Sequence, residues 1–117
     1  TDLKVRAIRN LTKIPIVVII GPVTKSAGSM VAIAFKGRPN TYIIGEPTAD
    51  GYTTSNGYFQ FTSNLTLNFA TNYVADRNKT IYKTTVNPEL TINERDNFDN
   101  LLNDEKIRAA IKWLKEK

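Results

Sequence analysis

The chain has 117 residues, of which 41% are hydrophobic and 23% charged, and this balance suits one domain or part of a larger one. It contains no cysteine and no histidine. The absence of cysteine excludes disulfides, a thiol nucleophile and a zinc–thiolate centre from this chain. The absence of histidine excludes an imidazole as a base and as a metal ligand. No apolar run approaches the length of a membrane span.

The formal net charge is +5, and a basic chain of this kind requires nucleic acid to be considered as a partner. No nucleic-acid motif interleaves the basic residues, so we expect no nucleic-acid partner. The basic residues between Lys106 and Lys117 lie beside acidic residues on a predicted helix, as is typical of a solvated face. No carboxylate cluster suggests a metal, and we expect neither metal nor cofactor. The two basic groups are Lys4, Arg6, Arg9 and Lys13, and Lys106, Arg108, Lys112, Lys115 and Lys117.

The first predicted elements are a strand, a loop and a helix. The β-branched run Ile16–Ile20 shows no alternation, which predicts a strand buried on both faces, and Gly21 ends it. Residues 26–36 carry few polar side chains and predict a helix buried between other elements. Gly37 is the residue expected just beyond the end of that helix.

The middle of the chain is predicted to be rich in strands. Thr41–Ile44 indicates a second short buried strand. Residues Gly45–Gly57 are rich in Gly, Thr and Ser and predict a loop long enough to be functional. Alternation predicts strands at Tyr58–Phe61 and Leu65–Phe69, the second with its apolar residues on one face, and Asn64 between them fits a tight turn.

The last third of the chain returns through short elements to a helix. Asp76-Arg77 predicts a turn with a surface ion pair, and short strands follow at Thr80–Tyr82 and Leu90–Ile92. Asp104 is the expected N-cap of a helix whose apolar residues recur at i, i+3, i+4 and i+7. This order predicts a mixed α/β chain with too few crossovers for a complete doubly wound sheet, and therefore part of a larger domain.

Ser26 stands where the first loop meets the first helix. A serine there, with the free N–H groups of the first helical turn, suits a nucleophile beside an oxyanion site. Serine is also a preferred N-cap residue, and the local pattern leaves that alternative open. A serine nucleophile needs an adjacent base. At the start of a helix the side chain of Lys25 would point away from that of Ser26, which disfavours Lys25 as the base. Glu46 is a weak candidate for an acidic member of the catalytic group.

Three blocks, at residues 15–29, 34–54 and 75–89, stand in order ahead of Asp104 and the segment 110–114. Together they resemble the carboxyl-terminal processing (tail-specific) serine peptidases, and most closely the tricorn and retinoid-binding-repeat-like subgroup. The resemblance covers roughly residues 15–114. It implies a Clp-protease/crotonase-like α/β fold, with residues 1–117 forming the carboxyl-terminal portion of the catalytic domain.

The resemblance also implies roles for single residues. It places the nucleophile on Ser26 and one oxyanion donor on the backbone N–H of Ala27, with the second donor upstream. The chain departs from the family at Ser29, where a glutamate is usual, and at Gly51, where many members carry a lysine base. It departs again at Tyr82, where tricorn-like members place an acid. We therefore expect the base to come from sequence outside this chain, and the chain alone to be inert.

Three functions fit these patterns. The first is a serine peptidase acting on peptide or protein substrates, in the extracytoplasmic setting common in the family. The second is a non-catalytic member of the same fold that binds a peptide or an apolar small molecule. The third is a basic α/β interaction module in which Ser26 only caps a helix. A fragment would leave an apolar helix face at Met30 and Ile33 uncovered, which favours self-association.

Overall fold

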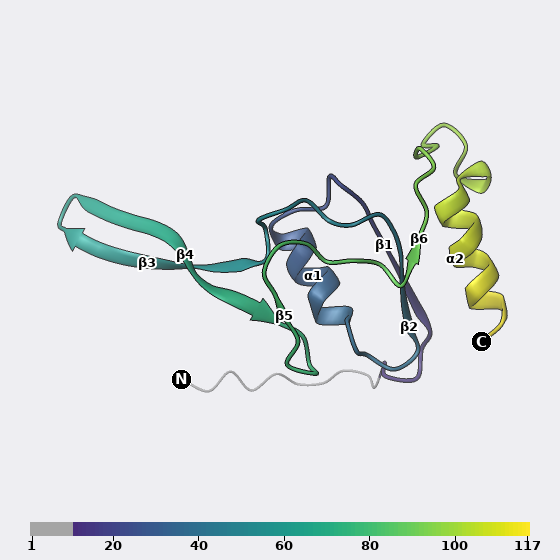
Figure 1. Ribbon diagram of the computed structural model, residues 1–117, viewed down its shortest axis with the longest axis horizontal. Helices are drawn as coiled ribbons and strands as arrows, with labels where there is room; N and C mark the ends of the chain where they lie inside the picture. Colours follow the sequence, from purple (N-terminus) through teal and green to yellow (C-terminus); the bar gives the residue numbers. More distant parts are fainter. Residues whose placement is uncertain (1–10) are drawn as a thin grey trace.

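The computed structural model describes residues 11–117 (Figure 1). The basic residues Lys4, Arg6 and Arg9 lie outside the described residues. The mixed α/β class is confirmed. The elements are β1 (Ile16–Ile20), α1 (Ala27–Phe35), β2 (Thr41–Gly45), β3 (Thr54–Thr62), β4 (Leu65–Ala75), β5 (Ile81–Tyr82), β6 (Leu90–Thr91), the 3-10 turn η1 (Leu101–Asn103) and α2 (Glu105–Lys115).

A parallel sheet in the order β1-β2-β6 forms the centre of the body. Strand β1 pairs with β2 from Ile16↔Thr41 to Ile20↔Gly45, and α1 and α2 lie on opposite sides of this sheet (Figure 1). The predicted strand Ile16–Ile20 is confirmed, but full burial on both faces is wrong because β1 is an edge strand and Ile19 is 39% exposed.

The core lies between α1 and the parallel sheet, with Ile33, Ile43 and Val86 almost inaccessible to solvent. The predicted helix is confirmed, but it buries only one face. The expectation that Ile33 forms an uncovered face is wrong, because Ile33 points into the core, and Met30 packs against that core. The exposed apolar face of α1 instead carries Ala27, Val31 and Ala34, and Val31 is 53% exposed.

A second, antiparallel sheet in the order β3-β4-β5 carries a long hairpin that projects from the body as an arm (Figure 1). The predicted loop Gly45–Gly57 is too long, because β3 begins at Thr54. There the chain pairs with Tyr73 of β4, and this long-range pairing overrides a composition rich in turn-forming residues. The tight turn at Asn64 is confirmed, and the Asn64 N–H donates to the Thr62 hydroxyl at 3.3 Å.

The predicted turn at Asp76 is confirmed, but the predicted ion pair between Asp76 and Arg77 is wrong. The Asp76 carboxylate accepts hydrogen bonds from the N–H groups of Asn78 (2.8 Å) and Thr80 (3.0 Å). The Arg77 guanidinium instead donates to the carbonyl oxygen of Ala34 at 2.7 Å. Arg77 therefore satisfies a carbonyl in the last turn of α1, where a cation is favourable.

Asp104 caps α2 as predicted. Its carboxylate accepts from the Ile107 N–H at 2.9 Å and from the Asn97 N–H at 2.8 Å, which ties the segment before η1 to the start of the helix. These backbone hydrogen bonds hold the pKa of Asp104 below its usual range, against the opposing effect of burial. Two backbone donors therefore depend on the ionised form of this carboxyl.

We expect Asp104→Ala to lower the Tm by several degrees at neutral pH, because both donors lose their acceptor. The folded-state pKa is depressed, so this stability is present above the ordinary pKa of aspartate and is lost as the pH falls through the folded-state value. Thermal melts of the two proteins should therefore converge in acid. A difference that persists below the folded-state pKa would contradict this role.

Candidate active site

Ser26 immediately precedes α1 and has an unusual backbone conformation, with φ 51° and ψ −119°. These angles match the first central position of a type II′ turn, and the Gly28 N–H closes that turn by donating to the Lys25 carbonyl at 3.0 Å. The position favours glycine, so a serine here is held under strain by its surroundings. Strain of this kind concentrates at functional sites, including the strand-to-helix turns that expose nucleophilic serines.

Ser26 occupies the N-cap position, but its side chain makes no capping hydrogen bond to the helix. The alternative that the serine hydroxyl is there to cap α1 is therefore wrong. Ser26 is exposed, so its Oγ is available to a bound molecule.

The strain at Ser26 can be measured. We expect Ser26→Gly to be more stable than Ser26→Ala by about 1 kcal/mol, because glycine adopts positive φ without steric cost and alanine does not. Urea unfolding of the two variants gives the difference directly. Equal midpoints would mean that the turn relaxes to negative φ and that Ser26 is not strained.

Ser26 opens onto a pocket of about 570 Å³. Alternation along β3 places Thr54, Asn56 and Tyr58 on the same face of the strand, and all three line this pocket. The other lining residues are Ala27, Met30, Gly51 and Tyr52. The pocket thus joins the start of α1 to the base of the β3–β4 arm.

Ala27 is the first residue of α1, where no intrahelical carbonyl is in reach of the backbone N–H. The next N–H, that of Gly28, is already bonded to Lys25. The helix start also favours negative charge. An oxyanion formed beside Ser26 would therefore meet one backbone donor at the wall of the same pocket.

The three departures from the family pattern lie in different surroundings. Gly51 lines the pocket with Ser26. Ser29 is fully buried on the core side of α1, where its hydroxyl has no hydrogen-bond partner among residues 11–117. Thr53, beside the pocket residues, is buried in the same way. Tyr82 donates its hydroxyl to the Asp76 carboxylate at 3.0 Å. Burial and this acidic partner raise the pKa of Tyr82, which keeps the phenol protonated.

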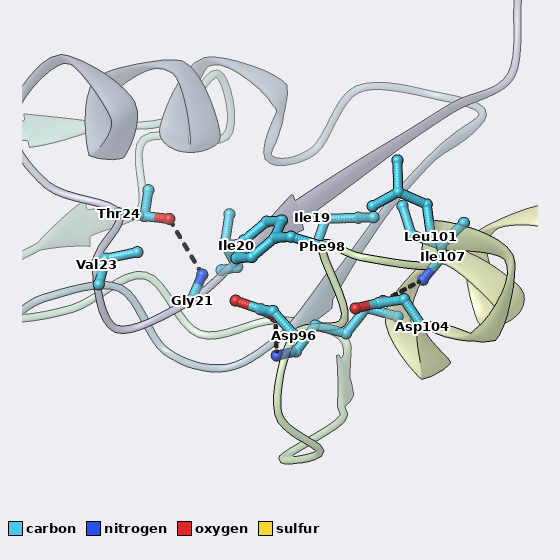
Figure 2. Close-up of a pocket in the computed structure, with 11 residues that line it drawn as sticks. Ile19, Ile20, Gly21, Val23, Thr24, Asp96, Phe98, Leu101, Asp104 and Ile107 are labelled. Atoms are coloured by element: carbon cyan, nitrogen blue, oxygen red, sulfur yellow. Dashed lines mark hydrogen bonds and ion pairs between the residues drawn. The ribbon is translucent and has the colours of Figure 1, made fainter.

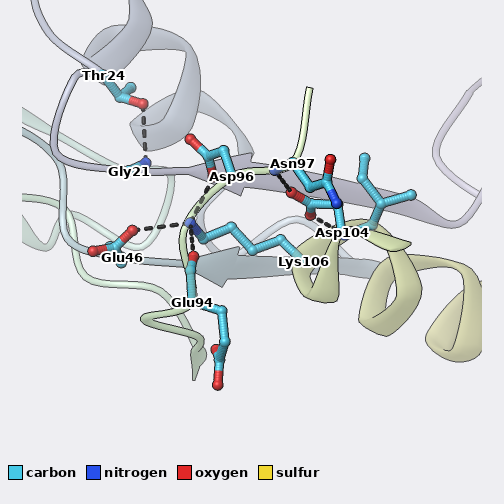
Figure 3. Close-up of polar contacts among 9 residues, drawn as sticks. Gly21, Thr24, Glu46, Glu94, Asp96, Asn97, Asp104 and Lys106 are labelled. Carbon is cyan, nitrogen blue, oxygen red and sulfur yellow. Dashed lines mark hydrogen bonds and ion pairs between the residues drawn. The ribbon is translucent and has the colours of Figure 1, made fainter. Parts of the chain in front are cut away.

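Glu46 is engaged elsewhere. Its carboxylate binds the Lys106 ammonium at 2.9 Å, and Lys106 also donates to Asp96 (2.7 Å) and to the Glu94 carbonyl (2.9 Å), as Figure 3 shows. The Lys106 side chain is only 4% exposed. The expectation that Lys106 belongs to a solvated face is therefore wrong, because it is the buried hub that joins α2 to the loop after β2.

Two interpretations fit the segment Gly45–Thr48: a turn that ends strand β2, or a part of the chain that shapes the active site. Thr48 is buried; its hydroxyl accepts from the Val86 N–H at 2.9 Å, and its own N–H donates to the Val86 carbonyl at 3.1 Å. Gly45 has φ 117°, and a Cβ there would lie 2.1 Å from the Ile20 carbonyl oxygen. The segment is thus a structural turn that closes the end of β2 against its neighbours.

A second, smaller cavity of about 190 Å³ lies between the end of β1 and the start of α2 (Figure 2). Its lining is mainly apolar, with the polar residues Asp96, Asp104 and Lys106 at one side, and those groups already bind one another or the backbone. Within residues 11–117 we find no cluster of acidic side chains that could hold a metal ion. No helix in that range is long and apolar enough to cross a membrane.

The sequence pattern of peptidase family S41 matches residues 2–92. This chain belongs to peptidase family S41. The resemblance to the carboxyl-terminal processing peptidases is thereby confirmed.

Two named proteins are similar to this S41 chain. It is 31% identical over 108 residues to the nisin-resistance protein of Lactococcus lactis subsp. lactis, across 92% of this chain and 30% of the relative. It superimposes with a TM-score of 0.68 on a lipoprotein from Streptococcus agalactiae at 31% identity, across 87% of this chain and 32% of that one. The chain therefore spans about a third of the length of each relative.

Proposed function

We propose that this chain supplies the nucleophile of a serine-type peptidase that cleaves peptide bonds through an acyl-enzyme on Ser26. The observation that carries this proposal is the state of Ser26 in a member of peptidase family S41. Its hydroxyl makes no capping hydrogen bond, its backbone has a positive φ, and the residue lines a pocket. Strain retained at an exposed serine supports a role in chemistry better than a role in stability.

In this proposal the Ser26 Oγ attacks the carbonyl carbon of the scissile bond while a base takes its proton. The Ala27 N–H donates to the oxygen that becomes negative, and the start of α1 favours that charge. The proton then passes to the leaving amine, and water hydrolyses the ester. No cofactor is required for these steps.

The base and the second oxyanion donor are proposed to come from polypeptide outside this chain. Gly51 in the pocket offers no base, and the Tyr82 phenol and the Glu46 carboxylate are bound to other groups. Two observations support a larger domain: β1 is an edge strand of the sheet formed by residues 11–117, and the relatives are about three times as long. We accordingly place residues 1–117 as the carboxyl-terminal portion of a Clp-protease/crotonase-like catalytic domain.

The substrates are proposed to be extended peptides or protein tails. Thr54, Asn56 and Tyr58 present a polar, uncharged wall along β3 that leads to Ser26, which suits an extended backbone. We propose an extracytoplasmic, cell-envelope setting, which is supported by similarity to a lipoprotein and to a nisin-resistance protein.

Fluorophosphonate labelling with mass-spectrometric site mapping tests the proposal. The full-length protein should be labelled at Ser26, its Ser26→Ala variant should not, and the 117-residue chain should stay unlabelled because it lacks the base. Absence of label in a folded full-length protein would overturn the peptidase proposal. It would favour a non-catalytic member that binds peptides, an alternative supported by the departures at Ser29 and Gly51.

A further inference from the structure

The loop that leads from β1 to Ser26 is closed by its own hydrogen bonds. The Thr24 N–H donates to the Gly21 carbonyl at 2.8 Å, and the Gly21 N–H donates to the Thr24 hydroxyl at 3.1 Å (Figure 3). Thr24 also lies against the first turn of α1, since a Cβ on Gly28 would be 3.1 Å from the Thr24 methyl group. A shift of Thr24 is therefore passed on to Ser26, which follows two residues later.

The turn formed by residues 46–49, after β2, holds this loop through the backbone. The Glu46 N–H donates to the Ile20 carbonyl at 3.0 Å, and the Ala49 N–H donates to the Thr24 carbonyl at 2.9 Å. Among the described residues that line the Ser26 pocket, none belongs to this turn. The turn therefore reaches Ser26 through these two hydrogen bonds and not through a side chain in the pocket.

The turn is in turn held by α2. The Glu46 carboxylate binds the Lys106 ammonium at 2.9 Å, and the Lys106 side chain is only 4% exposed. Lys106 is fixed by two further acceptors, the Asp96 carboxylate at 2.7 Å and the Glu94 carbonyl at 2.9 Å (Figure 3). Of the ion pairs formed within residues 11–117, the one to Lys106 is the one that reaches the turn. Glu46 is thus held against a fixed point on α2.

We propose that Lys106 is a positioning residue for Ser26: from α2 it holds Glu46 and the turn 46–49, and thereby the loop that presents Ser26 to its pocket. This inference rests on the proposed function of Ser26. Neither Lys106 nor Glu46 lines the pocket, so both act through the loop and not on the substrate. Displacement of a reacting group by about 1 Å can lower a rate by about 100-fold, so a loop held less firmly should react more slowly.

The two carboxylate partners of Lys106 provide a matched pair of variants. Glu46→Ala and Asp96→Ala each remove one carboxylate from Lys106, but only Glu46 belongs to the turn. Lys106 keeps two acceptors in either variant, so both proteins should fold. A merely structural role of the ion pairs predicts similar effects of the two substitutions. Positioning predicts that Glu46→Ala and Lys106→Met affect Ser26 and that Asp96→Ala does not.

Two readouts are taken on the full-length protein, with circular dichroism as a check of folding. The rate of fluorophosphonate labelling at Ser26 should fall about 10-fold in Glu46→Ala and Lys106→Met, and should stay within about twofold of the parent in Asp96→Ala. Hydrogen exchange of the Ala49 amide does not depend on the chemistry of Ser26. It should become about 10-fold faster in the first two variants and stay unchanged in Asp96→Ala.

The possible outcomes are distinct. Unchanged Ala49 exchange in Glu46→Ala and Lys106→Met, or equally slow labelling in Asp96→Ala, would overturn the inference. Slow labelling in Glu46→Ala but not in Lys106→Met would also overturn it, and would indicate that Glu46 acts in the reaction itself. All of these results leave the peptidase proposal standing. A folded parent protein that is not labelled at Ser26 would instead overturn the peptidase proposal, and with it this role of Lys106.

Discussion

Replacing Ser26 with alanine in the full-length protein is expected to lower kcat for peptide hydrolysis by about 10³-fold or more, because loss of a nucleophile leaves only binding and oxyanion stabilisation. KM should change little, since the pocket residues on β3 are untouched. The Ser26 hydroxyl makes no capping bond, so the variant should fold normally. Steady-state kinetics on a single peptide bond, with circular dichroism as a check of folding, measures both effects.

Ser29→Ala is the matched control for that experiment. Ser29 lies in the first turn of the helix that Ser26 precedes, but its hydroxyl is buried and has no hydrogen-bond partner in the described part of the chain. Its removal should leave kcat within a small factor of the parent and should not destabilise the fold, because no bond is lost. A fall in kcat for Ser29→Ala as large as that for Ser26→Ala would contradict the assignment of the nucleophile.

Replacing Lys106 with methionine is expected to lower the free energy of unfolding by about 2 kcal/mol, because the Glu46 and Asp96 carboxylates and the Glu94 carbonyl all lose their hydrogen-bond donor. Lys106 is 4% exposed at its side chain, whereas Glu46 is 26% and Asp96 43% exposed, so solvent moderates the cost. Lys112→Met, on the exposed side of the same helix, should change stability by less than about 0.5 kcal/mol. Urea unfolding of both variants gives the comparison.

The effect of Lys106 should also depend on pH in one direction. Burial disfavours the charged form, but Asp96 and Glu46 outweigh it and raise the pKa of Lys106 above its ordinary value. Its stabilisation is therefore present below the ordinary lysine pKa of about 10.4 and is lost as the pH rises through the folded-state value. A stability difference between parent and Lys106→Met that is already lost at neutral pH would mean that the ion pairs contribute nothing.

Local patterns predicted the elements near the site well. The run Ile16–Ile20, the apolar segment after Ser26 and the N-cap at Asp104 each carry their own signal, because strand and helix preferences are set by near neighbours. The local pattern placed Ser26 at the start of α1, and the family resemblance implied its role as the nucleophile. The structure adds that this serine lines a pocket with Gly51.

Features that depend on distant residues could not be predicted in this way. Lys106 looks like a solvated helix residue by spacing, and its burial follows from Glu46, which is 60 positions away in the chain. The start of β3 at Thr54 depends on pairing with Tyr73. The positive φ of Ser26 has no signature in composition, since glycine is the residue expected at that turn position.

The central claim is that Ser26 forms the acyl-enzyme, and trapping that ester tests it most directly. The full-length protein is quenched in acid during turnover of a peptide substrate and digested after lysine, which isolates residues 26–36 as one fragment. We predict the acyl mass of the substrate on this fragment, assigned by fragmentation to Ser26 and not to Ser29. Product formation with no acyl group on Ser26, or with the acyl group on another residue, would contradict the account.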